Sequence, residues 1–347
     1  MIPTPSPRAA VSRRRLLLAC VILAPCARAS AQDPGEPDRT RLRLPLLFGS
    51  LAVETAAITS GELIPYLGVG HFAQRAYGRG TAWALTEGTL IGARGWANGR
   101  AGVADPRRFP GVNGDTLYRR STGRSPAGDA WFRVGDFAYH TAFYARMADV
   151  SLAYRAAHRQ SRTATLPLDS NSLGRLSLAP VHPKDLASGW VLVPIALAGA
   201  SEFVQQRERP LRDVNELTVL GQRMSRTGGA LTALGHDALY LLSTAVGEEL
   251  FFRGLVQTEL TERWNPSLGI AGSTLAFAAF HIPNRGMGGA LIAGAAGAYL
   301  GTRFHRNGYQ LGELIAAHFW IDFLPGAIQF LRDARSGRTV SEVRWRR

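Results

Sequence analysis

The chain has 347 residues, of which 46% are hydrophobic and 19% charged, and its formal net charge at pH 7 is +14. This length allows one large domain or two modest ones, and the apolar content allows a large core or several membrane spans. The basic residues flank apolar segments and nowhere show the spacing of a nucleic-acid-binding module, so we expect no nucleic-acid partner. Both cysteines, Cys20 and Cys26, lie near the N-terminus. A chain processed after them has no disulfide, cysteine metal ligand or thiol nucleophile.

Residues 1–31 are predicted to be a signal peptide that directs export. Arginines at positions 8 and 13–15 form a basic start, and a short apolar stretch follows them. Ala29-Ser30-Ala31 then supplies the small residues of a cleavage site. An uncleaved membrane anchor is the alternative that this pattern leaves open.

Residues 32–97 begin with a polar linker and continue as a predicted helical hairpin in the membrane. The two apolar segments of the hairpin run from about 44 to 60 and from about 81 to 96. A basic turn rich in Pro and Gly joins them.

Residues 98–186 are rich in Arg, Asp, Gly and Pro, and this composition predicts a region in water or at the membrane surface. Between residues 129 and 158, apolar side chains recur near helical spacing and predict an amphipathic helix of about 25 residues. His140 and His158 are isolated histidines, and we expect both to be structural.

Residues 187–331 are predicted to be a helical membrane domain, and residues 332–347 a basic C-terminal tail. The apolar segments of this domain lie at about 187–204, 229–256, 267–282, 287–304 and 309–331. The predicted fold class is therefore all-α, a polytopic transmembrane helical bundle with an N-terminal signal peptide and a partly soluble N-terminal region. A soluble, buried helical core is the alternative reading of the same segments.

The stretch GEELFFRG places charged side chains inside an apolar run, where an unpaired charge costs about a few kcal/mol or more. Glu249 and Arg253 are four residues apart on the expected helix, so they share a face and can pair. Glu248 is rotated by about 100° from Glu249, and a structural ion pair leaves it unexplained.

Two further apolar segments carry histidines. His281 ends the segment STLAFAAFH, and Phe277 lies one helical turn before it. His318 and Asp322 are four residues apart in AAHFWIDF, so both point to the same side of a helix. One buried histidine is usually a satisfied core residue, but this many ionisable groups in apolar segments need partners or water.

Several chemistries fit this set of residues. A carboxylate beside a histidine can hold a water and take its proton for hydrolysis, and a second histidine can donate to an oxyanion. A zinc ion held by Glu248, His281 and His318 is the metal-dependent alternative, although no His-Glu-x-x-His motif is present. A proton-coupled transporter would place the same residue types in its spans.

Taken in order, Glu-Glu-x-x-x-Arg, Phe-x-x-x-His and His-x-x-x-Asp resemble the motifs of the CPBP family. These proteins are the type II CAAX-processing and bacteriocin-processing intramembrane endopeptidases, also called Abi proteins. The resemblance covers about residues 229–331. It implies an all-helical membrane bundle whose catalytic residues meet in a cavity within the membrane.

The resemblance also implies a role for each motif residue. Glu248 would activate a water with help from His281, and His318 with Asp322 would stabilise the oxyanion. Many family members have asparagine in place of Asp322, so an aspartate here implies either a protonated carboxyl or a group that orients His318. The implied supporting residues are Glu249, Arg253 and Phe277. The implied glutamate mechanism needs no cofactor, and zinc is the alternative.

We therefore expect an endopeptidase of the bacterial cytoplasmic membrane with an exported N-terminal region. Its expected partners are the lipid bilayer and a peptide or membrane-protein substrate. The alternative function is a non-enzymatic scaffold, immunity factor or regulator of the same family.

Overall fold

The computed structural model of the chain describes residues 40–60, 62–101, 126–205, 216–219 and 222–335. This part of the chain is helical, as predicted, apart from one short β-hairpin. The helices are α2 (Thr40–Ser60), α3 (Val69–Ala73), α4 (Tyr77–Ala101), α6 (Pro126–Arg159), α7 (Leu173–Ser177), the 3-10 turn η2 (Ala179–Val181), α8 (Pro183–Leu186), α9 (Gly189–Gln205), α10 (Arg226–Glu248), the π-helix η3 (Glu249–Gln257), α11 (Thr258–Arg263), α12 (Pro266–Arg306) and α13 (Gly312–Arg335). The predicted signal peptide and most of the predicted C-terminal tail lie outside the described residues.

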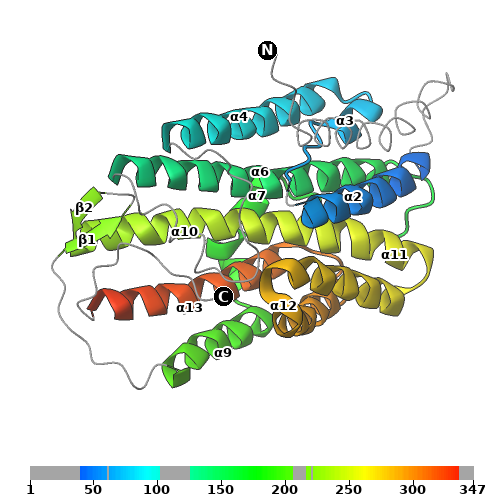
Figure 1. Ribbon diagram of the computed structural model, residues 1–347. Helices are drawn as coiled ribbons and strands as arrows, with labels where there is room; N and C mark the ends of the chain where they lie inside the picture. The colour runs from blue at the N-terminus through cyan, green and yellow to red at the C-terminus, as the bar shows by residue number, and fades with distance from the viewer. Residues whose placement is uncertain (1–39, 61, 102–125, 206–215, 220–221, 336–347) are drawn as a thin grey trace, which may run out of the picture.

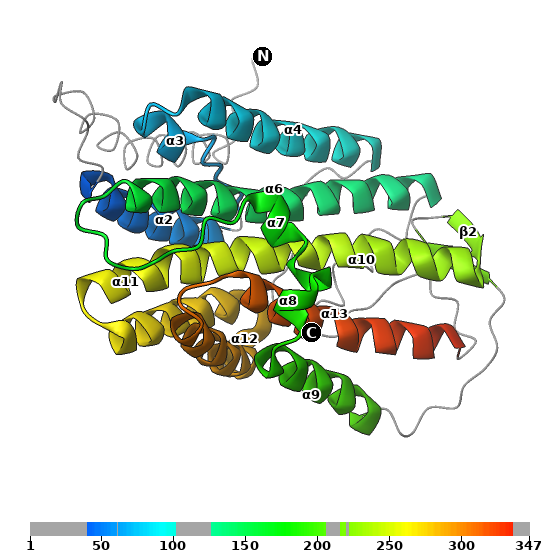
Figure 2. The same ribbon diagram turned by 180° about the vertical axis from the view of Figure 1, so that it is seen from behind.

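The long helices lie side by side in the order α4, α6, α10 and α13, with α9 beyond α13 (Figures 1 and 2). Helix α2 packs on α6, and α12 packs on η3 and α11. The buried apolar side chains form two clusters. One joins α10, α13 and the end of α12, and the other joins α2, α6, η3 and the start of α12. The second cluster places α6 in contact with the segment that carries the two glutamates.

Helix α6 packs between α4 and α10 and is an interior helix of the molecule. Its position in water or at a membrane surface stays a prediction. Two arginines of α6, Arg146 and Arg155, are buried, and each has a partner from another segment. Arg146 donates to Glu54 of α2 at 2.5 Å. Arg155 donates to Asp169 at 2.7 Å. A buried charge is tolerated when it is paired and hydrogen-bonded, so these arginines belong to the core.

The isolated histidines of α6, which we expect to be structural, are buried and contact other segments. The His140 Nε2 atom lies 2.8 Å from the Thr244 hydroxyl and 3.1 Å from the carbonyl oxygen of Tyr240, both on α10. His158 pairs with Glu262 of α11 at 2.9 Å. Both histidines therefore join α6 to the chain that follows α9.

Helix α10 begins after a β-hairpin that the sequence analysis did not predict. Strand β1 (Glu216–Val219) pairs antiparallel with β2 (Gln222–Ser225). The side chain of Ser225 then accepts a hydrogen bond from the Gly228 amide and caps the helix. The helix continues without a break into η3 and α11, so the predicted segment 229–256 is one part of a longer helical rod.

The predicted segments 267–282 and 287–304 are the two parts of α12. The N-terminal cap of α12 is Asn265, whose side chain accepts from the Leu268 amide. Gly286 interrupts the helix with φ 66° and ψ −177°, a conformation that only glycine adopts readily. The kink separates the half that carries His281 from the half in which Gly297 and Gly301 pack against Arg253 and Gln257 of η3.

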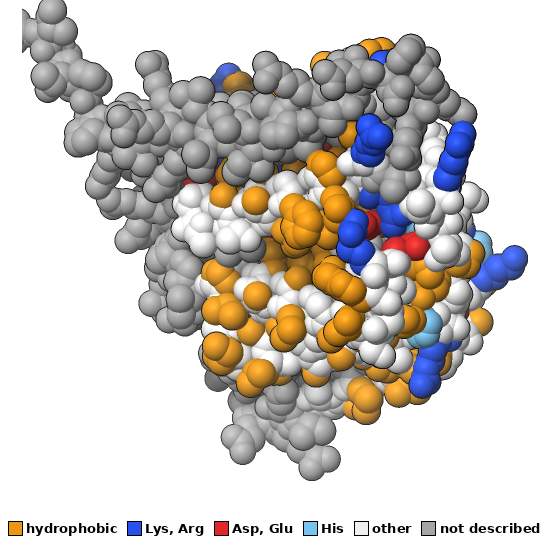
Figure 3. Space-filling view, turned by 90° about the vertical axis from the view of Figure 1, so that its right-hand side faces the viewer, with side chains coloured by type: hydrophobic (Ala, Val, Ile, Leu, Met, Phe, Trp, Pro, Cys, Tyr) orange, Lys and Arg blue, Asp and Glu red, His pale blue; other side chains and the backbone are white. Residues whose placement is uncertain are grey.

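No helix among the described residues combines the length and the apolar content expected of a membrane span. Large apolar side chains are nevertheless exposed along three helices of the C-terminal half. They are Leu192, Val193 and Leu197 of α9, Leu231 and Leu239 of α10, and Leu268, Leu275, Ile282, Met287, Leu291 and Ile292 of α12. Figure 3 shows one face on which hydrophobic side chains are widespread and charged ones gather toward an edge.

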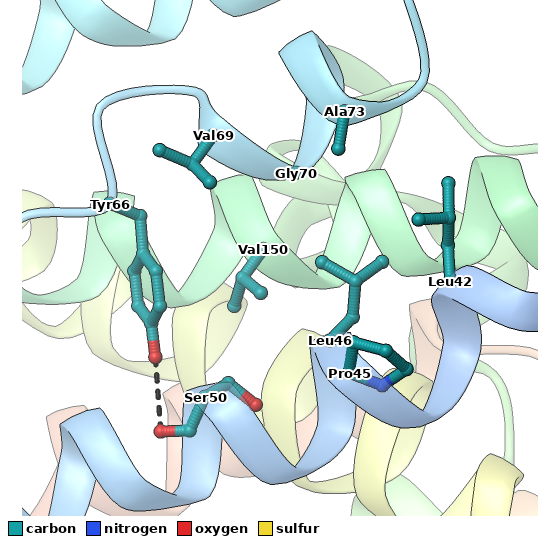
Figure 4. A pocket seen from close by; sticks show the side chains of 9 residues that line it. All are labelled: Leu42, Pro45, Leu46, Ser50, Tyr66, Val69, Gly70, Ala73 and Val150. Carbon is teal, nitrogen blue, oxygen red and sulfur yellow. Dashed lines mark hydrogen bonds between the residues drawn. The ribbon is translucent and has the colours of Figure 1, made fainter. Parts of the chain in front are cut away.

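An apolar pocket lies between α2, α3 and α6 (Figure 4). Its lining residues are Leu42, Pro45, Leu46, Ser50, Tyr66, Val69, Gly70, Ala73 and Val150. The Tyr66 hydroxyl donates to the Ser50 carbonyl oxygen at 3.1 Å. None of the predicted site residues lines this pocket.

Candidate active site

Glu248 and Glu249 lie where α10 passes into the π-helix η3. All nine residues of η3 are buried. A π-helix is rare and is frequently found at functional sites, because its wider turn changes which side chains share a face. Glu248 ends α10 and Glu249 begins η3, and both glutamates reach the same histidine although consecutive residues of an α-helix point about 100° apart.

The predicted ion pair between Glu249 and Arg253 is present and fully buried. Arg253 donates to Glu249 Oε1 at 2.8 Å and to the Gly297 carbonyl oxygen of α12 at 3.2 Å. Its guanidinium carbon also lies 4.6 Å from the centre of the Phe277 ring. The arginine therefore fixes η3 against both the first and the second half of α12.

His318 of α13 lies between the two glutamates. Its Nδ1 atom is 2.7 Å from Glu249 Oε1, and its Nε2 atom is 3.5 Å from Glu248 Oε2. Asp322 Oδ2 is 3.7 Å from the same Nε2 atom. Because Glu249 accepts at Nδ1, the proton on that nitrogen is fixed and Nε2 faces Glu248 and Asp322.

His281 reaches the same region from the first half of α12. Its Nδ1 atom lies 2.8 Å from the Phe277 carbonyl oxygen. A carbonyl can only accept, so Nδ1 carries a proton and Nε2 is left for another partner. The Phe277 ring centre is 4.5 Å from the His281 ring and 6.1 Å from the His318 ring. His281 also interacts electrostatically with both Glu248 and His318.

The structure thus brings all seven predicted site residues together in one cluster, in which Asp322 is partly exposed and the others are buried. Its shortest contacts differ from the expected grouping, which set Glu248 with His281 and His318 with Asp322. Instead His318 joins both glutamates, and Asp322 is the more distant partner. The residues Glu248, His281 and His318 are 1%, 5% and 7% exposed.

One contact to the cluster was missed by the sequence analysis. The Tyr144 hydroxyl of α6 donates to Glu248 Oε1 at 3.0 Å. Tyr144 is one of several aromatic residues at helical spacing in α6, and only Gly247 beside Glu248 indicates that another helix approaches there.

Among the described residues, no three His, Cys, Asp or Glu side chains are arranged to hold a metal ion.

Comparison with known proteins identifies part of the chain. Residues 232–324 match the family model described as "Type II CAAX prenyl endopeptidase Rce1-like". No curated protein and no solved structure matches the chain. The matched range includes every predicted site residue from Glu248 to Asp322, and Rce1-like proteins are a protease family. The chain therefore carries an Rce1-like domain of the type II CAAX prenyl endopeptidase family at residues 232–324, as the order of its three motifs predicted.

Proposed function

We propose that this chain is an endopeptidase that hydrolyses a peptide bond with a water activated by Glu248. The proposal rests on the burial and the contacts of the Glu248 Oε2 atom. This oxygen is buried, has no hydrogen-bond partner among the described residues, and lies 3.5 Å from His318 Nε2 in the Rce1-like domain. A buried carboxylate oxygen without a hydrogen-bond donor lowers the stability of the fold, and a catalytic role for Glu248 would explain why it is present.

In the proposed first step, a water lies between Glu248 Oε2 and His281 Nε2. Glu248 takes one proton from the water while the water oxygen attacks the carbonyl carbon of the peptide bond. The Nε2 atom of His281 accepts a hydrogen bond from the second O–H of the water. This nitrogen is unprotonated because the ring proton is on Nδ1, which donates to the Phe277 carbonyl oxygen. The attack converts the carbonyl oxygen into an oxyanion.

In the proposed second step, His318 Nε2 donates a hydrogen bond to that oxyanion. Three carboxylates surround the His318 ring, so its doubly protonated form has charged partners on both sides. The tetrahedral intermediate then collapses, the carbon–nitrogen bond breaks, and Glu248 delivers its proton to the leaving nitrogen. Preorganised donors of this kind commonly contribute several kcal/mol to lowering the barrier.

Glu249 and Arg253 support this arrangement in the proposal. Glu249 accepts from His318 Nδ1 and from Arg253 through the same oxygen, so the orientation of the histidine depends on the ion pair. Asp322 adds negative charge beside His318 Nε2 and orients the ring rather than acting as a neutral donor.

The test is cleavage of a peptide library by the purified chain, compared with Glu248→Gln. The variant keeps the shape of the side chain and removes the base, so cleavage should fall by roughly 10²–10⁴-fold. Glu313→Gln is the matched control, because Glu313 lies in the same domain and pairs with Arg303 at a partly exposed position. Full cleavage by the Glu248 variant would refute the proposal.

Two further measurements separate the alternatives. Cleavage should persist after treatment with a zinc chelator; its loss, and its return with added Zn²⁺, would favour the metal-dependent reading. If the chain acts in cells as a scaffold or regulator, its effect should persist in the Glu248→Gln variant. Comparing peptides from cells with the intact chain and with this variant would also identify the substrate class.

We also propose that the enzyme works in a membrane, with α9, α10 and α12 facing lipid. The proposal is supported by the exposed leucine, isoleucine and valine side chains on these helices, since large contiguous apolar surfaces usually mark partner or membrane contacts. The chain should remain in the pellet after alkaline extraction of bacterial membranes. Release into the supernatant would contradict a lipid-embedded site.

A further inference from the structure

We propose that Tyr144, a residue of α6 outside the matched domain, is a positioning residue for Glu248. This inference rests on the proposed function, because it assigns Tyr144 to the base of that reaction. It extends the working site from the Rce1-like segment to a helix that the three motifs do not include.

The contact itself selects which oxygen of Glu248 reacts. The Tyr144 hydroxyl donates to Oε1 at 3.0 Å, while Oε2 faces His318 Nε2 at 3.5 Å. A carboxylate rotates easily about its last torsion when nothing holds it. The tyrosine therefore fixes Oε1 as the anchored oxygen and leaves Oε2 to receive the proton of the water. A hydrogen bond to a charged acceptor is stronger than a neutral one.

The position of Tyr144 is itself held by close packing between α6 and α10. A Cβ atom added to Gly247 would lie 2.7 Å from Tyr144 Cβ and 2.8 Å from the Tyr144 carbonyl oxygen. Only glycine therefore allows the two backbones to come this close. The rings of His140 and Phe143 contact the Tyr144 ring, with centres 4.7 Å and 5.2 Å away.

A second contact one helical turn earlier fixes the register of the two helices. The His140 Nε2 atom lies 2.8 Å from the Thr244 hydroxyl. His140 and Tyr144 are four residues apart on α6, and Thr244 and Glu248 are four residues apart on α10. These two contacts at matching intervals hold the tyrosine hydroxyl opposite the carboxylate, so its place does not depend on one flexible side chain.

The same helix supplies a matched comparison. Tyr154 is fully buried on α6, and its hydroxyl donates to the buried carboxylate of Glu259 at 2.7 Å. Glu259 also accepts from Arg43 at 2.8 Å, and this ion pair includes none of the predicted site residues. Tyr154→Phe therefore removes the same kind of hydrogen bond from the same helix without touching the site.

The experiment measures kcat, KM and the midpoint of thermal unfolding for the full-length chain and three variants, Tyr144→Phe, Tyr154→Phe and Glu248→Gln. Tyr144→Phe keeps the ring and removes one hydroxyl. We expect kcat to fall by about 10-fold or more, as the loss of a hydrogen bond to a charged group predicts. KM should stay within about two-fold, because the tyrosine binds the carboxylate and not the peptide. Tyr154→Phe should lower the unfolding midpoint and leave kcat unchanged.

Each outcome supports or overturns the inference. If Glu248→Gln abolishes cleavage and Tyr144→Phe cleaves like the wild-type chain, the role of Tyr144 is refuted and the proposed function stands. An equal fall of kcat in Tyr144→Phe and Tyr154→Phe means that both act through stability, and also overturns it. Absence of cleavage by the wild-type chain refutes the proposed function, and this inference with it.

Discussion

The buried pair of Glu249 and Arg253 offers a sharp test of how the site is held together. Arg253→Met replaces the guanidinium with an apolar side chain of similar length. It removes the 2.8 Å contact to Glu249, the 3.2 Å contact to the Gly297 carbonyl and the stacking on Phe277. Breaking a buried ion pair by removing one partner typically costs about 3–5 kcal/mol.

The contacts that remain after Arg253→Met determine how much the free energy of unfolding falls. His318 Nδ1 still donates to Glu249 Oε1 at 2.7 Å, so the carboxylate keeps one charged-group hydrogen bond after the substitution. We therefore expect the free energy of unfolding to fall by about 3 kcal/mol, the lower end of that range. Against a total stability of about 5–15 kcal/mol, this is a large fraction.

Two comparison variants identify the cause. Replacing both partners, as Glu249→Leu with Arg253→Met, removes the unpaired charge. It leaves His318 Nδ1 without its acceptor, at about 1–3 kcal/mol, and the Gly297 carbonyl without the arginine, as in the single variant. The double variant should therefore be more stable than Arg253→Met alone, and its cleavage activity should be low because His318 is no longer oriented. Arg303→Met breaks the partly exposed pair with Glu313 and should cost less than about 1 kcal/mol.

Denaturant unfolding of the detergent-purified chain, followed by tryptophan fluorescence, measures all of these differences. A cost below about 1 kcal/mol for Arg253→Met would show that the pair is as weak as an exposed one. A double variant less stable than the single one would show that packing, and not charge, dominates the position. Either result would refute the reasoning.

Two further predictions concern α6. Burial, reinforced by the neighbouring Glu87 carboxylate, raises the pKa of Asp149 to about 8, whereas an unfolded aspartate titrates near about 3.9. Between about pH 4 and about pH 8 the folded state keeps a proton that the unfolded chain loses, so the free energy of unfolding should decrease as the pH rises through this range. In the Asp149→Asn variant this decrease should be smaller, as measured by denaturation curves at several pH values. A truncated chain that begins at residue 187 lacks α6 and exposes Phe251 and Phe252, which α6 covers. This truncated chain should aggregate or unfold, as measured by size-exclusion chromatography and circular dichroism. A monomeric product that melts cooperatively would contradict the prediction.

The residue pattern predicted which residues come together in the site, although not how they pair, because a charged side chain in an apolar segment needs a partner or water. The i, i+4 spacing of Glu249 and Arg253 predicted their pair, and the leftover carboxylate of Glu248 predicted a further partner. Periodicity also located the helices, including the two halves of α12 on either side of Gly286. These features depend on local spacing, which the sequence contains directly.

The burial of α6 could not be read in the same way. Arg146 and Arg155 look like a solvated face when the sequence is read locally, because their carboxylate partners lie 92 and 14 residues away in the chain. Hydrophobic periodicity separates apolar from polar positions, but it does not show which polar positions are paired across the fold. The β-hairpin before α10 was missed for a related reason, since a strongly basic connection carried no clear strand signal.

The sequence pattern did not predict the π-helix η3, nor that both glutamates share one histidine. An α-helical reading directs Glu248 away from Glu249 and gives each glutamate its own partner. Instead the carboxylates of Glu248 at the end of α10 and Glu249 at the start of η3 both reach the ring of His318, so Glu248, His318 and the Glu249–Arg253 ion pair form one connected network. A substitution at the supporting pair should therefore disturb catalysis through the histidine as well as stability.

The motif residues alone do not complete the environment of Glu248. The Rce1-like segment supplies His318 on the Oε2 side, but the donor on the Oε1 side comes from α6, outside residues 232–324. Gly247 permits this because it lets α6 approach where any other side chain would collide with Tyr144. The glycine of the GEE sequence is thus as specific a part of the site as the glutamates, and its physical reason lies in a helix that the motifs do not contain.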